Sequence, residues 1–150
     1  MRTYQYTGGD RDEINLRTFG KLFKKNGKYF VVYEETELTG YEGSTTTIKI
    51  ESDQMTMTRM GKYKSKMIFK RGEKFLSYCE TPYGTVPVAI CPKKVDISFS
   101  DMGGNLEIEY TLDMNNDEFA TNILYMEITS LTKYNTPETA KFVYNEHTLK

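Results

Sequence analysis

Hydrophobic and polar residues alternate with a period of two along much of this chain. The alternation is clearest over residues 106–114, where the apolar set is Leu106, Ile108, Tyr110, Leu112 and Met114. Successive side chains of a β-strand point to opposite faces, so the pattern predicts a strand with one buried face. Because the same alternation recurs with turn residues between the segments, we expect an all-β fold.

The alternation divides the chain into eight to nine short strands: residues 11–25, 28–37, 45–51, 54–60, 64–70, 74–80, 95–100, 106–114 and 122–131. The short links suit an antiparallel meander, because parallel strands need crossovers of a dozen or more residues. A long antiparallel sheet usually curls shut, which removes its edges. We therefore expect a single antiparallel β-barrel over residues 1–134.

Turn residues set the predicted hairpins. Asn26-Gly27 is a strong signal for a two-residue hairpin, because both central positions of a type I′ turn need a positive φ. Residues 81–84, Thr-Pro-Tyr-Gly, fit a type I turn. Pro87 and Pro92 cannot donate a ladder hydrogen bond, so the extended run that holds them is predicted at a sheet edge or at a bulge.

The C-terminal segment, residues 135–150, is predicted to be a peripheral tail with a short helix. Thr136 suits an N-cap and Pro137 suits a first helical turn. His147 is the only histidine of the chain and has no Cys or His neighbours in the sequence, so no metal site and no cofactor is expected.

The charge and the cysteine content limit the binding partners and the cellular compartment that we expect for the protein. Lys and Arg number 20 and Asp and Glu number 21, which gives a net charge of −1 and no global attraction to nucleic acid or to an anionic membrane. No apolar run is long enough for a signal peptide or a membrane helix. Cys79 and Cys91 are too few for a disulfide framework, so we expect reduced thiols in a cytoplasmic protein.

Several short motifs occur in a recognisable order, and the chain resembles the YwiB-like family of uncharacterised bacterial proteins over about residues 12–132. The motifs are Tyr33-Glu34, residues 45–50, Arg59-Met60-Gly61, Met67, Phe69, Gly72, the turn at 81–84 and Gly103-Gly104. The resemblance implies a calycin-like β-barrel, related in shape to the lipocalins, and implies no activity. The Trp that lipocalins carry near the first strand is missing, so their ligand chemistry is not transferred to this chain.

Arg59 and Glu34 are the sharpest candidate site residues. If Met55 and Met57 face inward, Arg59 shares their face close to the end of its strand, before Gly61. A guanidinium there could bind a ligand carboxylate or phosphate, or it could close the barrel end by pairing with a carboxylate. Glu34 is predicted to point inward with Phe30 and Val32, which makes it the expected partner of Arg59.

A basic stretch over residues 59–74 supplies a second hypothesis. Lys62, Lys64 and Lys66 share one face, which could contact nucleic acid or an acidic protein. Residues 95–132 contain acidic residues and no Lys or Arg, so a solvated outer face is the favoured interpretation and nucleic acid is not the expected partner. We expect exposed lysines and, at most, weak and non-specific binding of nucleic acid.

The functional interpretation is a non-enzymatic container for a small, largely apolar molecule with one polar end. Arg59, Glu34 and Tyr83 are predicted to line or guard its mouth. The alternatives are an interaction module that uses residues 59–74 and a filled barrel that acts through self-association. A cavity of a few hundred cubic ångströms distinguishes the container from the filled barrel. A lone carboxylate without a second acid, a histidine or a metal cluster is weak evidence for catalysis.

Overall fold

The computed structural model describes the backbone of residues 2–7, 10–37, 40–114, 117–130 and 139–149, and the side chains of residues 19–37, 40–113 and 121–130. These residues form eleven strands and no α-helix: β1 (Arg2–Thr7), β2 (Asp10–Lys25), β3 (Lys28–Glu34), β4 (Ser44–Ile50), β5 (Gln54–Gly61), β6 (Ser65–Lys70), β7 (Phe75–Thr81), β8 (Gly84–Ser100), β9 (Gly103–Met114), β10 (Asp117–Ser130) and β11 (Thr139–Leu149). The all-β prediction is therefore confirmed.

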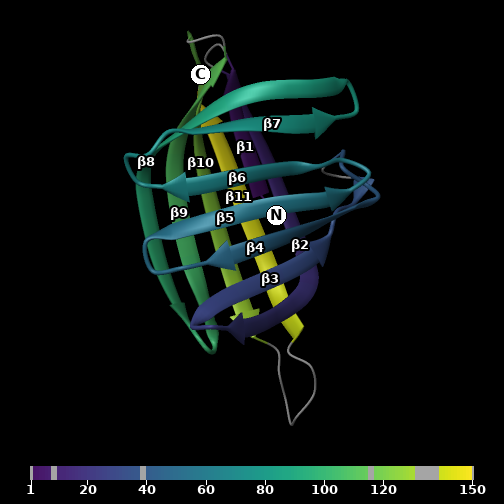
Figure 1. Cartoon of the computed structure of the whole chain (residues 1–150), viewed down its shortest axis with the longest axis vertical. Coiled ribbons are helices and arrows are strands. Elements are labelled where there is room, and N and C mark those ends of the chain that lie inside the picture. Colours follow the sequence, from purple (N-terminus) through teal and green to yellow (C-terminus); the bar gives the residue numbers. More distant parts are fainter. Residues whose placement is uncertain (1, 8–9, 38–39, 115–116, 131–138, 150) are drawn as a thin grey trace.

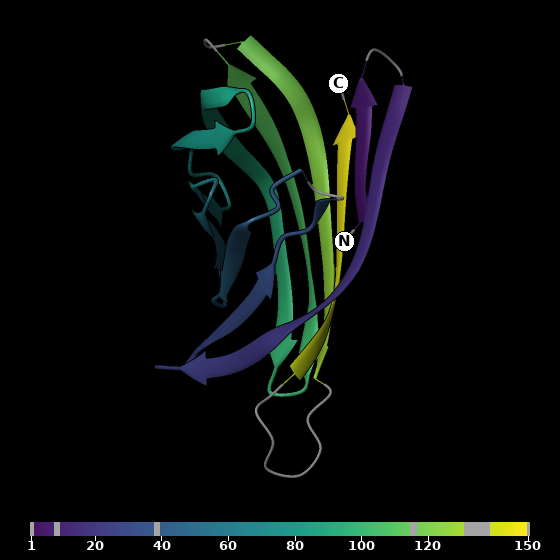
Figure 2. The ribbon, with the colours of Figure 1, turned by 90° about the vertical axis from the view of Figure 1, so that its right-hand side faces the viewer.

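The strands form one ladder in the order β6-β5-β4-β3-β2-β1-β11-β10-β9-β8-β7. Neighbours are antiparallel except β1 and β11, which run parallel. The long strand β2 curves from one side of the molecule to the other, so that β3–β7 face β8–β11 and β1 across the core (Figures 1 and 2). The sheet is thus folded over into two layers.

The two end strands of the ladder, β6 and β7, adjoin each other without forming a ladder. The amide of Glu80 donates to the carbonyl of Lys64 at 2.9 Å, and the Ser77 hydroxyl donates to the carbonyl of Lys66 at 2.5 Å. Regular backbone pairing between these strands is not found in the described residues. The predicted closed barrel is therefore not confirmed, because the sheet curls but its ladder stays open at this seam.

Side chains fill the space between the layers. The largest fully buried ones include Phe69, Ile48, Met55, Ile90, Ile108 and Met126, which come from both layers. The rings of Phe69 and Tyr110 meet edge to face with centroids 5.0 Å apart, which joins the two layers at the centre. The middle of the molecule is thus a packed core of the kind that the filled-barrel alternative requires.

The predicted turn at Asn26-Gly27 and the predicted bulge agree with the structure. Asn26 and Gly27 have φ angles of 52° and 76°, as a type I′ turn requires. A register shift between Pro92 and Lys94 marks the bulge that was expected near the prolines. Cys79 lies opposite Val86 in the β7–β8 hairpin, and both cysteines are free.

The prediction for the C-terminal tail was wrong. Residues Thr139–Leu149 form strand β11, which pairs along β10 and also with β1, in the middle of the sheet. Thr136 and Pro137 lie outside the described residues. Capping residues favour a helix only locally, whereas two neighbouring strands satisfy the backbone of the whole segment. Strand β1 was likewise not predicted, and the described strands number eleven rather than eight or nine.

Candidate functional site

A polar cluster is buried between the layers near the ends of β3 and β5. Nη2 of Arg59 lies 3.8 Å from Oε1 of Glu35, and the two side chains are 11% and 0% exposed. The Thr46 hydroxyl donates to the same Glu35 oxygen at 2.6 Å. Nη1 of Arg59 donates to the Ser65 hydroxyl at 3.3 Å. The guanidinium also stacks on the Tyr41 ring, with Cζ 3.7 Å from the ring centroid.

The expected partner, Glu34, points to solvent and is not in this cluster. Val31 and Tyr33 are the buried residues of β3, and Glu35 continues their parity just beyond the strand. The prediction placed Phe30 and Val32 inside, and a shift of one residue reverses the face of every side chain in a strand. Arg59 itself is inward-facing and paired, as predicted, but its partner is the adjacent glutamate.

The Arg59–Glu35 ion pair is enclosed by other side chains, but not all of its polar atoms have hydrogen-bond partners. Among the residues that the structure describes, Oε2 of Glu35 and Nε of Arg59 are buried and have no hydrogen-bond partner. Burial raises the pKa of Tyr33 well above its usual value, and the nearby Glu35 carboxylate raises it further. The arrangement serves to neutralise a buried charge, since a ligand could not reach these atoms without displacing the side chains around them.

Tyr83 does not join the cluster. It lies at the tip of the β7–β8 hairpin and is 98% exposed. The Thr81 hydroxyl accepts a hydrogen bond from the Tyr83 amide at 3.1 Å and donates to the Gly84 carbonyl at 2.8 Å, so the turn is held without the Tyr83 ring. The structure therefore brings none of the three predicted site residues together with another.

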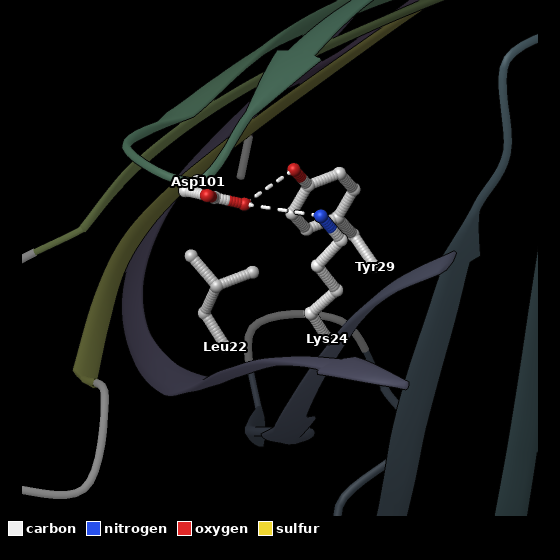
Figure 3. Close-up of a pocket in the computed structure, with 4 residues that line it drawn as sticks. All are labelled: Leu22, Lys24, Tyr29 and Asp101. Carbon is white, nitrogen blue, oxygen red and sulfur yellow. Dashed lines mark hydrogen bonds and ion pairs between the residues drawn. The ribbon is translucent and has the colours of Figure 1, made fainter. Parts of the chain in front are cut away.

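A hollow of about 270 Å³ lies at the opposite end of β3 and is lined by Leu22, Lys24, Tyr29 and Asp101 (Figure 3). Leu22 and Lys24 lie on the same face of β2, and Tyr29 is the cross-strand partner of Lys24. Asp101 comes from the turn between β8 and β9 in the opposite layer. Residues of both layers therefore line this hollow.

A second hollow, of about 240 Å³, also has Tyr29 in its lining. Its lining residues are Gly27, Tyr29, Ile50, Glu51, Ser52, Ile97 and Phe99. The Tyr29 and Phe99 rings are tilted by 57° with centroids 4.8 Å apart, so Tyr29 packs on the opposite layer. We call the two hollows together the Tyr29 pocket.

Three charged or polar groups meet in the Tyr29 pocket. The Tyr29 hydroxyl donates to Oδ1 of Asp101 at 2.6 Å, and Nζ of Lys24 lies 3.6 Å from the same oxygen (Figure 3). The hydrogen bond raises the pKa of Tyr29 and lowers that of Asp101. The Asp101 carboxylate in turn raises the pKa of Lys24. The pocket therefore holds a carboxylate and an ammonium that stabilise each other's charged forms.

Sequence reasoning missed this pocket because its polar groups are far apart in the chain. Tyr29 and Asp101 are separated by 72 positions. The hints were local: Tyr29 follows the Asn-Gly turn, and Asp101 begins a turn with two glycines. Only the folding of one layer over the other places the two turns at the same end of the molecule.

The described part of the chain has neither a metal-binding cluster of His, Cys, Asp or Glu residues nor a membrane-spanning helix. No group of three or more His, Cys, Asp or Glu residues there could hold a metal ion. No helix in that part is long and apolar enough to cross a membrane.

Comparisons with known proteins give information about the family and the fold, and not about the pocket. A family model described as "Domain of unknown function (DUF1934)" matches residues 1–126. The chain is similar to the crystal structure of ywiB protein from Bacillus subtilis, with a TM-score of 0.67 and 14% identity over 99% of this chain and 86% of that one. No curated protein matches the chain. At this identity the structural likeness concerns the fold alone.

Proposed function

The chain belongs to the DUF1934 family of domains of unknown function, and we propose that it binds a small, largely apolar molecule with one polar end in the Tyr29 pocket. The expected relationship to YwiB-like proteins is confirmed by the family match and the shared fold. The observation that carries the proposal is the pair of hollows, of about 270 and 240 Å³, that share Tyr29 in their lining.

The chemistry of the pocket walls supports a ligand of this kind. Apolar side chains from both layers contribute about half of the lining: Leu22, Ile50, Ile97 and Phe99. A few polar groups, among them Lys24 and Asp101, converge at one side. Small-molecule sites generally combine an apolar surface with a small number of placed polar groups. The size suits a small molecule better than a large lipid, because packed side chains occupy the centre of the interior.

The proposal moves the binding residues away from those predicted from sequence. Lys24, Tyr29 and Asp101 take the place of Arg59, Glu34 and Tyr83 at the ligand's polar end. We propose binding without catalysis in a cytoplasmic protein. Asp101 is already engaged by Lys24 and Tyr29, and Glu51 is paired with Lys28, so both carboxylates of the pocket are poor general bases.

The proposal is tested by filling the pocket. Ser52 is exposed and lines the second hollow, so Ser52→Trp should occupy that space without disturbing the core. Ser98 is exposed on β8 and does not line either hollow, so Ser98→Trp is the matched control. Amide chemical shifts are followed by NMR while 1-octanol is added.

In the wild type and in Ser98→Trp, the largest shifts should occur at residues 22–29 and 97–101, and Ser52→Trp should weaken this response at least about fivefold. Shifts that centre on Arg59, or a Ser52→Trp protein that responds like the control, would contradict the proposal. Mass spectrometry of molecules that co-purify with the protein provides an independent readout.

A second candidate is an interaction module that binds an acidic protein through its basic face, which we define as Lys62, Lys64 and Lys66. All three lysines are exposed, whereas Ser65 and Phe69 on the other face of the same segment are buried. Binding of polyglutamate that disappears in Lys64→Met/Lys66→Met would support it. Nucleic-acid binding that persists above roughly 0.2 M salt would contradict our expectation of a weak, non-specific contact.

A further inference from the structure

Resting on the proposed function, we infer that the polar end recognised in the Tyr29 pocket is a cation, either an amine or a quaternary ammonium group, which takes the position held by the Lys24 ammonium. In the structure this position is occupied from within the chain. Lys24 thus acts as an internal competitor for the site.

The surroundings of the Lys24 ammonium are those of a cation site. Its Nζ atom lies 3.6 Å from Oδ1 of Asp101 and 5.3 Å from the centroid of the Tyr29 ring. A cation within about 6 Å of an aromatic centroid is attracted by the electron-rich face of the ring. The combination of a ring face with a carboxylate therefore already binds one ammonium group.

The carboxylate and the ring stay in place without Lys24. The Tyr29 hydroxyl donates to Asp101 at 2.6 Å, which holds the carboxylate beside the ring. The Phe99 ring supports Tyr29 from the opposite layer, with centroids 4.8 Å apart. A site whose groups are fixed by contacts of their own keeps its geometry when the internal cation leaves.

Lys24 can leave at little cost. Its side chain is 52% exposed, so the ammonium can move into solvent while the backbone of β2 remains paired with β3. Both acids that border the pocket, Asp101 and Glu51, disfavour an anionic ligand. Glu51 is already paired with Lys28 at 3.1 Å and Lys49 at 3.9 Å, so Asp101 is the carboxylate that an incoming cation would meet beside Tyr29.

The test uses three probes of equal chain length that differ only in their polar end: octylammonium, 1-octanol and octanoate. Affinities are measured by calorimetry at pH 7 for the wild type, Lys24→Met, Asp101→Asn and the control Lys25→Met. Lys25 is the exposed neighbour of Lys24 on β2, and the wild-type contact with Asp101 is made by Lys24. Lys24→Met retains the length of the apolar stem but removes the competing ammonium.

Octylammonium should bind the wild type most tightly of the three probes. Its affinity should rise about three- to tenfold in Lys24→Met and stay unchanged in Lys25→Met. Asp101→Asn should remove the preference for octylammonium over 1-octanol while leaving the binding of 1-octanol in place.

The three probes separate the failure of this inference from that of the proposed function. Binding of all three with equal affinity, or tightest binding of octanoate with a loss in Lys24→Met, overturns the cation assignment and leaves the container standing. Failure of all three to bind overturns both. A Lys24→Met protein with unchanged affinity for octylammonium also overturns the role of Lys24 as an internal competitor.

Discussion

Glu35 and Arg59 form an ion pair between two buried side chains, with Oε1 of the acid 3.8 Å from Nη2 of the base. The adjacent residue Glu34 is exposed and lies opposite Thr45 at the end of β3. Burying a carboxylate without a partner costs several kcal/mol, so Arg59 is needed where it lies whatever the protein binds. The structural interpretation of Arg59 is thus the one that the geometry supports.

The first prediction concerns this pair. Arg59→Met should lower the free energy of unfolding by about 3 kcal/mol, because the Glu35 charge then stays buried without its cationic partner. Lys64→Met, which changes an exposed lysine just before β6, should change stability by less than about 0.5 kcal/mol. Urea denaturation followed by circular dichroism measures both values.

The neighbouring glutamates provide a sharper contrast. Glu34→Gln should leave the urea midpoint unchanged, whereas Glu35→Gln should lower it, because only the second removes the negative charge beside Arg59. Equal effects of the two substitutions would show that the parity of β3 is not as described. Binding of 1-octanol should be unaffected by Glu34→Gln, since the Tyr29 pocket lies at the other end of the strand.

A second prediction concerns the close approach of strands β8 and β9. A Cβ atom added to Gly104 would collide with the Ser98 carbonyl oxygen and would lie 2.7 Å from the Phe99 Cα, both of which are backbone atoms. Gly104→Ala should therefore cost about 3 kcal/mol or more, because the strands must separate to relieve the clash. Thermal unfolding measures the effect.

Gly27→Ala is the control for this substitution. Gly27 has a φ of +76°, and no atom lies within 4 Å of the position that an alanine Cβ would take there, so only the left-handed backbone opposes the change. We expect a loss of about 1–2 kcal/mol for Gly27→Ala. A Gly104→Ala protein no less stable than Gly27→Ala would mean that β8 and β9 are less tightly packed than described.

A third prediction concerns alkaline pH. Burial, and secondarily the Glu35 carboxylate, raise the pKa of Tyr33 well above 10.0. Because the folded pKa exceeds the unfolded one, the neutral hydroxyl contributes stability that is present below pH 10 and is lost as pH rises toward the folded pKa. Tyr33→Phe should therefore flatten the decline in stability above pH 10. An ultraviolet titration in which Tyr33→Phe removes a tyrosinate signal near pH 10 would contradict this.

A fourth prediction concerns acid pH and the contact between Tyr29 and Asp101. The hydrogen bond from Tyr29, and then the Lys24 ammonium, lower the pKa of Asp101 below 3.8. Its folded pKa lies below the unfolded one, so the contact stabilises the fold above pH 3.8 and the contribution is lost as pH falls through the folded value. In Tyr29→Phe, the Asp101 pKa should rise toward 3.8. Carbon NMR of the Asp101 carboxyl group measures the shift, and an unchanged pKa would show that the hydrogen bond is absent in solution.

The sequence by itself determined those strands and turns that depend on a pattern of only a few neighbouring residues. Alternation marked the buried faces of β4 and β9, and Asn26-Gly27 set the β2–β3 hairpin. These features depend on the period of the strand and on the backbone preferences of single residues, which act before any tertiary contact forms.

The tertiary structure decided what depends on distant segments. Strand β11 lies between β10 and β1 in the sheet. Because β1 and β11 come from opposite ends of the chain, no local sequence pattern predicts their parallel pairing. The choice of Glu35 over Glu34 depended on which face of β3 met the opposite layer. The Tyr29 pocket exists because folding places the turn at Asp101 against Tyr29, 72 positions away. Alternation predicts that one face of a strand is buried. Only packing between the layers decides which face that is, and at which end of the molecule the packed core gives way to open space.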